Sequence, residues 1–245
     1  MRRKYYAHRE LACQEPSSYL STIADGMDQA KVRVPRLGRE TKGITKQFDT
    51  SLEGVLFHGT LRRMDVYIVP HTFKGGSNVT IHCLNESLKR MQQAYKDANM
   101  KWPRTWFLQL DNTTKENKNQ FVLGWLQTLV DAGVFDEIYV SFLPVGHTHE
   151  DIDQRFSVFS RALRRTAILS VQHLIVFLSQ FFQVGVETPE LATTMFRHMI
   201  SLGLGLALGS LVPHAFGCMS HVMSMEGVRL KGCARRICSL GLQFS

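Results

Sequence analysis

Cysteine is scarce in this chain, and its spacing suits neither metal nor disulfide chemistry. The 245 residues include five cysteines, at positions 13, 83, 218, 233 and 238. Their number is odd and no two of them form a CxxC pair, which excludes a zinc knuckle and a framework of disulfides. We therefore expect a protein of a reducing, intracellular compartment, and a nuclear one if it acts on DNA.

Long apolar runs are scarce as well. Met1–Tyr6 is basic, but no apolar stretch follows it, so this segment does not resemble a secretory signal. The most apolar segment, residues 199–217, is diluted by glycine and serine and interrupted by Pro213 and His214. A membrane span needs about 20 strongly apolar residues. The sequence therefore favours a protein without a membrane partner.

The composition is that of a globular protein with an excess of positive charge. Hydrophobic residues make up 44% of the chain and charged residues 20%, which argues against wholesale disorder. A chain of this length is expected to form one main domain. The formal net charge is +8, and a basic protein favours polyanionic partners. DNA is thus the expected partner, and a homo-oligomer is left open.

Residues 105–163 read as a strand, an acidic turn and a helix, followed by a second unit of the same plan. In the first unit, the apolar run Trp106–Leu110 predicts a strand. Asp111 and Asn112 form the turn, and helix-forming residues follow over 118–130. Asp111 thus stands at the carboxyl end of a strand, where open α/β sheets bind their ligands.

The second unit carries the most unusual polar segment of the chain. Ile138–Leu143 predicts a strand, residues 144–146 end it, and His147–Asp153 opens a helix that runs to about Arg164. Capping explains any single acidic residue here, because carboxylates favour the positive end of a helix dipole. A polar segment with two histidines and three acidic residues directly after an apolar strand indicates a functional site instead.

Further elements are expected on both sides of this stretch. Residues 1–18 form a basic lead-in with a helix from His8 to Cys13. Earlier strands are expected at residues 19–24, 32–35, 52–59 and 64–70, and a helix at residues 79–98. Asp25 follows the first strand, in an Asp-Gly pair that is also a common hairpin turn. Near the C-terminus we expect helices at residues 173–186 and 189–199, and no regular element from Arg229 onward.

This α/β order, β-β-β-α-β-α-β-α with carboxylates after two strands and at the start of the last helix, resembles the ribonuclease-H-like fold. The motifs that carry the resemblance are Asp25–Lys31, Gln109–Asn112 with Glu116–Asn119, and Phe142–Asp153, which ends in GHTHEDID. They are similar to those of an uncharacterised domain family of transposon-derived eukaryotic proteins and, more distantly, to DDE transposase and integrase cores. The implied core covers residues 19–165, and a helical or degenerate region follows at residues 166–245.

The resemblance implies a nuclease or strand-transfer core that uses two divalent ions, Mg²⁺ or Mn²⁺, on DNA. Two-metal phosphoryl chemistry needs hard oxygen ligands that bridge ions about 4 Å apart. We assign Asp25 as the bridging ligand, and Asp111 and Asp153 as the second and third carboxylates. Glu150 lies one helical turn before Asp153 and is the alternative third ligand. Asp28 is the alternative to Asp25.

Other polar residues of these motifs have two interpretations each. His147 and His149 could bind metal, move protons or contact substrate, or they could simply hydrogen-bond the turn. Asp151 faces away from Asp153, and we assign it to helix capping. Four residues stand where they could meet a phosphate, although capping explains them equally well: Asn112, Asn117, Lys118 and Asn119.

Two other functions compete with the nuclease. His147-x-His149-x-Asp151 is similar to the zinc-binding HxHxDH motif of metallo-β-lactamase-like hydrolases, but Ile152 stands where the last histidine should be. The glycine-rich continuation of that motif is also missing. The remaining hypothesis is a domesticated or decayed transposase core that binds nucleic acid or protein without turnover. The chain retains all three acidic residues, which favours metal binding in either case.

Overall fold

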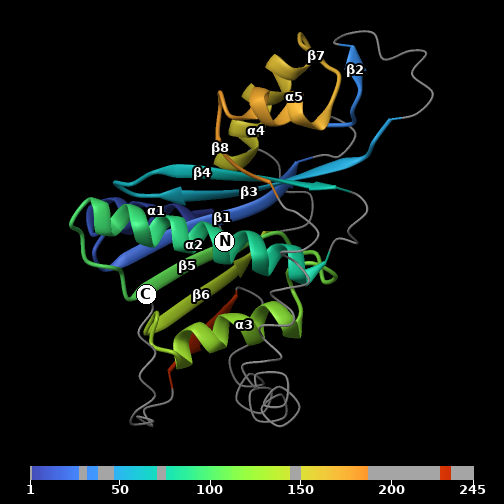
Figure 1. The fold of residues 1–245 in the computed structure, drawn as a ribbon. Coiled ribbons are helices and arrows are strands. Elements are labelled where there is room, and N and C mark those ends of the chain that lie inside the picture. Colours follow the sequence, from blue (N-terminus) through green and yellow to red (C-terminus); the bar gives the residue numbers. More distant parts are fainter. Residues whose placement is uncertain are drawn as a thin grey trace.

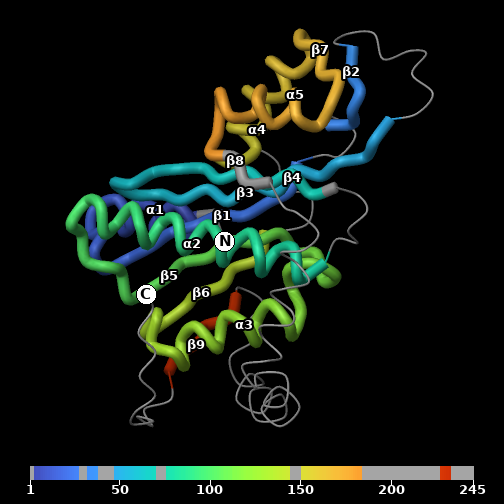
Figure 2. Tube along the Cα trace, in the orientation of Figure 1, coloured from blue at the N-terminus to red at the C-terminus, as the bar shows by residue number. Residues whose placement is uncertain are grey.

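The computed structural model of this chain describes residues 2–27, 32–37, 47–70, 76–143, 150–186 and 227–232. Its main sheet has seven strands in the order β8-β4-β3-β1-β5-β6-β9 (Figures 1 and 2). The strands are β1 (Tyr19–Met27), β2 (Arg36–Leu37), β3 (Thr50–His58), β4 (Arg63–Pro70), β5 (Thr105–Leu110), β6 (Glu137–Phe142), β7 (Ala167–Ile168), β8 (Gln183–Val186) and β9 (Val228–Lys231). The helices are α1 (Arg2–Gln14), α2 (Ser77–Asp97), α3 (Gln120–Asp131), α4 (Asp151–Leu163) and α5 (Val171–Leu178).

Three parallel strands form the middle of the main sheet. β1 pairs with β5 and β5 with β6, both in parallel, so their carboxyl ends lie at the same edge. β3 pairs antiparallel with β1, and β4 pairs antiparallel with β3. β8 extends the sheet beyond β4, and β9 extends it beyond β6. The mixed α/β architecture expected from the sequence is confirmed.

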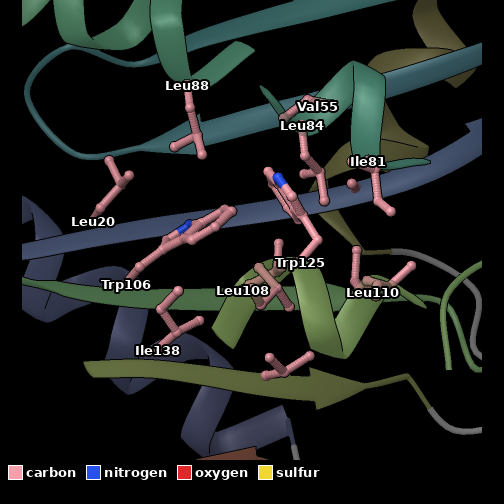
Figure 3. Close-up of a cluster of buried hydrophobic side chains, with 14 of the residues drawn as sticks. Leu20, Val55, Ile81, Leu84, Leu88, Trp106, Leu108, Leu110, Trp125 and Ile138 are labelled. Carbon is pink, nitrogen blue, oxygen red and sulfur yellow. The ribbon is translucent and has the colours of Figure 1, made fainter. Parts of the chain in front are cut away.

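α2 and α3 cover one face of the sheet. Their buried side chains form a core cluster with β1, β3, β5 and β6 (Figure 3). Trp106 of β5 is fully buried and meets Trp125 of α3 edge-on, with 6.4 Å between ring centroids. Its indole N–H donates to Thr22 Oγ1 on β1 at 2.9 Å. Because burying one large apolar side chain stabilises by about 1.5–3 kcal/mol, this layer holds β1 and β5 side by side.

α1, α4 and α5 pack on the opposite face, in a second core cluster. Ile152 and Phe156 of α4 approach β3 where that strand has a glycine. A Cβ atom on Gly54 would lie 2.7 Å from Phe156 Cζ and 3.3 Å from Ile152 Cδ1, so a larger residue would force these side chains to shift. Gly54 pairs with Asp25 of β1. The glycine therefore places the first turns of α4 close to the strand end that carries Asp25.

Apart from the strand at residues 32–35, the elements expected between residues 19 and 163 are present, with small shifts at their ends. The helix expected at His8–Cys13 is longer, because α1 extends over Arg2–Gln14 and buries Tyr5 at 6% exposure. The strand expected at residues 32–35 is reduced to one bridge between Val34 and Phe48. The regular pairing begins one residue later, where β2 joins β7 in a second, two-stranded sheet, seen near α5 at the top of Figure 1.

Two expectations for the C-terminal region are wrong. The helix predicted over residues 173–186 ends early, because α5 stops at Leu178 and the following chain forms β8 on the open edge of β4. β9 pairs with β6 although no element was expected from Arg229 onward. Both strands take their hydrogen bonds from distant parts of the chain, which a local pattern does not show. The helix expected over residues 189–199 lies outside the described residues.

The sequence did not favour a membrane span. Among the helices that the structure describes, none is both long and apolar enough to cross a bilayer. The weakly apolar segment at residues 199–217 lies outside the described residues.

Candidate functional site

Asp25 and Asp111 occupy neighbouring positions at the carboxyl edge of the sheet. The last registered pair between β1 and β5 is Ala24 with Leu110, and the two aspartates are the next residues along each chain. Both are half-buried. Asp25 Oδ1 accepts a hydrogen bond from the following backbone N–H at 2.8 Å. Asp111 Oδ1 accepts one at 2.7 Å from the backbone N–H two residues on. The structure thus brings two of the three assigned carboxylates together.

A carboxylate that the sequence did not single out, Glu53 of β3, faces the same edge. Glu53 pairs with Gly26, and its carboxylate oxygens lie 3.3 Å from where a Cβ atom on that glycine would be. Burial, together with the negative charges of Glu116, Asp25 and Asp111, raises the pKa of Glu53 to about 8. We call these four carboxylates, Asp25, Glu53, Asp111 and Glu116, the acidic edge. Burial and the repulsion within the acidic edge together favour the protonated form of Glu53 at neutral pH.

The third assigned residue, Asp153, lies in the first turn of α4. It lines a cavity of about 550 Å³ together with Gly26 and Met27 from the end of β1. Asp153 also forms a capping box with Glu150, whose backbone N–H donates to Asp153 Oδ2 at 3.2 Å. Glu150 is only 1% exposed, whereas Asp153 is half-buried. Asp153 is therefore better placed than Glu150 to meet a ligand beside β1.

Asp151 belongs to a different, buried network on the far side of the same helix turn. Its Oδ2 lies 2.8 Å from His58 Nε2, and its Oδ1 accepts a hydrogen bond from the Tyr5 hydroxyl at 2.5 Å. Arg9 donates to Oδ2 at 3.3 Å, and His58 Nδ1 lies 3.0 Å from Ser21 Oγ. The network joins α1, β1 and β3 to α4. The capping role predicted for Asp151 is wrong, because Glu150 and Asp153 cap the helix.

The charges in this network keep Asp151 ionised. Burial alone would raise the pKa of Asp151, but the hydrogen bonds and charges of His58, Tyr5 and Arg9 outweigh it and lower the pKa to about 2. Burial and the hydrogen bond to Asp151 raise the pKa of Tyr5 well above its ordinary range. Tyr5 therefore stays protonated and acts as a donor. With three donors on two oxygens, Asp151 has little capacity left for a zinc ion.

Two polar residues near the start of α3 have clear structural contacts. Asn119 is the N-cap residue, and its Oδ1 accepts from two backbone N–H groups of the first turn at 3.1 and 3.2 Å. Asn117 is buried at 8% exposure and accepts a hydrogen bond from Thr80 Oγ1 of α2 at 2.9 Å. Asn119 thus caps α3, as the capping interpretation has it, whereas Asn117 ties the turn after Asp111 to α2.

The other expected site residues are less constrained or are not described. Lys118 is exposed, and its Nζ lies 5.4 Å from the ring centroid of Phe142. Asn112 is half-buried directly after Asp111. Three expected site residues lie outside the described residues: Asp28, His147 and His149.

The described residues contain no ready-made metal centre. Among them, no group of three or more histidine, cysteine, aspartate or glutamate side chains is arranged so that it could hold a metal ion. A ligand set drawn from the acidic edge and Asp153 would have to draw together around an ion. The chemistry of the donors is nevertheless that of a hard-cation site, because all of them are carboxylates.

Comparison with known proteins gives one match. No curated protein and no solved structure matches the chain. A family model described as a domain of unknown function (DUF7869) matches residues 41–219, which is more than half of the chain. The matched range includes Glu53, Asp111 and Asp153, whereas Asp25 precedes it. The chain belongs to this family, the domain of unknown function DUF7869.

Proposed function

We propose that this chain is the core of a nuclease or strand-transfer protein that processes phosphodiester bonds in DNA with the help of Mg²⁺ or Mn²⁺. The observation that carries the proposal is the position of Asp25 and Asp111, one residue beyond the last registered pair of two adjacent parallel strands. Ligands of open α/β sheets bind at this edge. The charge coupling of both aspartates to Glu53 supports a single acidic site.

The order of the elements supports a ribonuclease-H-like core of the transposon-derived type. After α1, the main sheet begins with three antiparallel strands, β1, β3 and β4, with the short β2 between the first two. α2, β5, α3, β6 and α4 then alternate. This is the order that the sequence resemblance implies. It brings the carboxyl ends of β1 and β5 and the start of α4 to one region, since Asp153 lines the same cavity as Gly26.

The acidic edge fits a divalent cation by its chemistry. Burial is the main cause of the raised pKa of Glu53, and the neighbouring carboxylates add to it. A divalent cation would relieve the repulsion among these carboxylates. Asp25, Asp111 and Asp153 are the residues that would hold it, with Glu150 as the alternative to Asp153. The chemistry that such ions supply is activation of the attacking water or hydroxyl and stabilisation of the leaving oxygen. The protein's own part is to position the carboxylates on rigid strand ends.

The test is Mn²⁺-dependent nicking of DNA by the wild type and by Asp111→Asn. The amide keeps the shape of the side chain but loses its negative charge, so nicking is expected to disappear. Asp131→Asn is the matched control, because Asp131 is exposed at the opposite end of α3 and its loss should leave nicking unchanged. Nicking that persists in Asp111→Asn would reject the role of Asp111.

A protein that binds DNA without turnover is the second candidate. It is favoured by the absence, among the described residues, of a group arranged to hold a metal ion, together with the +8 charge. The same assay separates the two functions. A wild type that binds DNA in a salt-sensitive way but never nicks it would establish the binding protein.

A further inference from the structure

The cavity beside β1 is a trough along one face of α4. The helix residues that line it recur at intervals of three or four, which places them on a single face: Asp153, Phe156, Ser157, Ser160, Arg161 and Arg164. Gly26 and Met27 form part of the other wall. The trough has a carboxylate at one end and two guanidinium groups at the other.

The basic end of the trough carries more positive charge than its lining residues alone. Arg161 lies in the last turn of α4, and Arg164 is the C-cap residue; both are exposed. Arg36 of β2 lies close enough to contribute. Burial lowers the pKa of Arg36, and the positive charge of Arg164 lowers it further. The guanidinium groups of Arg36 and Arg164 therefore lie near enough to repel each other.

Helix stability alone accounts for only part of this arrangement. Cations near a helix C-terminus gain about 0.3–1 kcal/mol from the dipole, which would explain Arg161 and Arg164 on any surface. It does not explain why both line a cavity together with Ser157 and Ser160, whose hydroxyl groups can donate to an anion. Arginine and hydroxyl side chains are the usual contacts to phosphate oxygens.

We propose that the Arg161–Arg164 end of the trough binds a backbone phosphate of the DNA. The proposal rests on the proposed function for the identity of its ligand, but it does not require cleavage. Arg161 follows Asp153 by eight residues, which is about 12 Å along a helix. Duplex DNA carries one phosphate per about 3.4 Å along each strand. The phosphate bound there is therefore a different one from the phosphate that faces the acidic edge.

The experiment measures binding of a short DNA duplex by fluorescence anisotropy at several salt concentrations, in EDTA. The double variant Arg161→Gln/Arg164→Gln is expected to bind at least ten times more weakly. Its slope of log K against log salt should be less steep by about 0.9, the value for the loss of one phosphate contact. Arg155→Gln is the matched control. Arg155 is exposed on the same helix, two residues from Asp153 and therefore on another face.

Two further variants guard against loss of folding. Ser157→Glu places a negative charge inside the trough and should weaken DNA binding several-fold. Val158→Glu places it on the neighbouring exposed position, which does not line the trough, and should have little effect. Thermal unfolding of each variant establishes that it is folded. Equal binding by Ser157→Glu and Val158→Glu would overturn the proposal, as would a double arginine variant that matches Arg155→Gln.

The outcomes also separate this proposal from the nuclease. Arginine-dependent binding in EDTA without nicking in Mn²⁺ would support the phosphate site and reject the catalytic function. Nicking by a protein whose DNA affinity does not depend on Arg161 and Arg164 would support the catalytic function and reject the phosphate site. Vesicles that contain phosphatidylserine test the other source of phosphate. Arginine-dependent vesicle binding with unchanged DNA binding would overturn the assignment to DNA.

Discussion

His58 Nε2 lies 2.8 Å from Asp151 Oδ2, and this contact joins the end of β3 to the first turn of α4. Both side chains are buried, at 4% and 7% exposure. The Asp151 carboxylate accepts only, so the imidazole must supply the proton of this hydrogen bond. Because Asp153 is on the same turn as Asp151, the contact also fixes where Asp153 stands relative to β1.

Loss of the Asp151 carboxylate should therefore destabilise the whole fold. Asp151→Ala leaves His58, Tyr5 and Arg9 without their common acceptor, and removal of one partner from a buried charged network costs about 3–5 kcal/mol. Urea denaturation of the wild type and the variant measures this difference. Asp97→Ala, which removes an exposed carboxylate from the end of α2, should change the free energy of unfolding by less than about 0.5 kcal/mol. Equal stability of the two variants would contradict the network.

The same network predicts a dependence of stability on acidic pH. The pKa of Asp151 is lowered to about 2 in the folded protein, so its ionised form stabilises the fold at any pH above its ordinary value. That stabilisation is lost as the pH falls from the ordinary value through about 2. Denaturation curves across this range should show a steeper loss for the wild type than for Asp151→Asn. Parallel curves would show that Asp151 titrates alike in the folded and unfolded states.

Glu53 predicts the opposite trend at alkaline pH. Its pKa in the folded protein is raised to about 8, so the folded state favours protonated Glu53. The stabilisation of the fold by this proton is fully present below the ordinary glutamate pKa. The contribution falls as the pH rises through about 8, because Glu53 must then ionise among other carboxylates. Glu53→Gln should remove this loss and make the variant more stable than the wild type near pH 9. Thermal unfolding at pH 6 and pH 9 tests the trend, which a constant difference between the two proteins would refute.

Gly54 predicts a steric effect on the position of α4. A Cβ atom there would lie 2.7 Å from Phe156 Cζ and 2.9 Å from Met64 Cε, so Gly54→Ala should cost about 1–3 kcal/mol of stability by overpacking. Phe156→Leu removes the clashing ring atom, and the double variant should lose less stability than the two single variants add up to. Strictly additive free energies of unfolding would show that the glycine does not set the approach of the helix.

Local patterns predicted the middle of this fold well. The strand and turn around Asp111 could be predicted because an apolar run ends there on polar residues. In the structure, the end of this strand lies beside the end of the strand that carries Asp25. β8 and β9 could not be predicted from local patterns, because their partners β4 and β6 lie more than 80 residues away in the sequence. Their pairing depends on which strand edges the completed sheet leaves open.

The candidate site was predictable only in part, for a related reason. The sequence indicates Asp25, Asp111 and Asp153 because each follows an apolar strand or begins a helix. Glu53 lies inside β3, and only its position as the one acidic residue of that strand could have indicated it. Its role depends on register, since it pairs with Gly26 and so reaches the end of β1. The partners of Asp151 come from α1 and β3, and no spacing along the chain connects them.

Mn²⁺ titration by calorimetry at pH 7 tests the central claim most directly. Glu53 is protonated at this pH because its pKa is about 8, and a cation that binds the acidic edge must displace that proton. Titrations in buffers with different ionisation enthalpies should therefore show that the wild type releases about one proton per protein when Mn²⁺ binds. Glu53→Gln should release none. Asp111→Asn should bind Mn²⁺ much more weakly. Absence of Mn²⁺ binding, or binding without proton release that Asp111→Asn leaves unchanged, would contradict a divalent-ion site at the acidic edge.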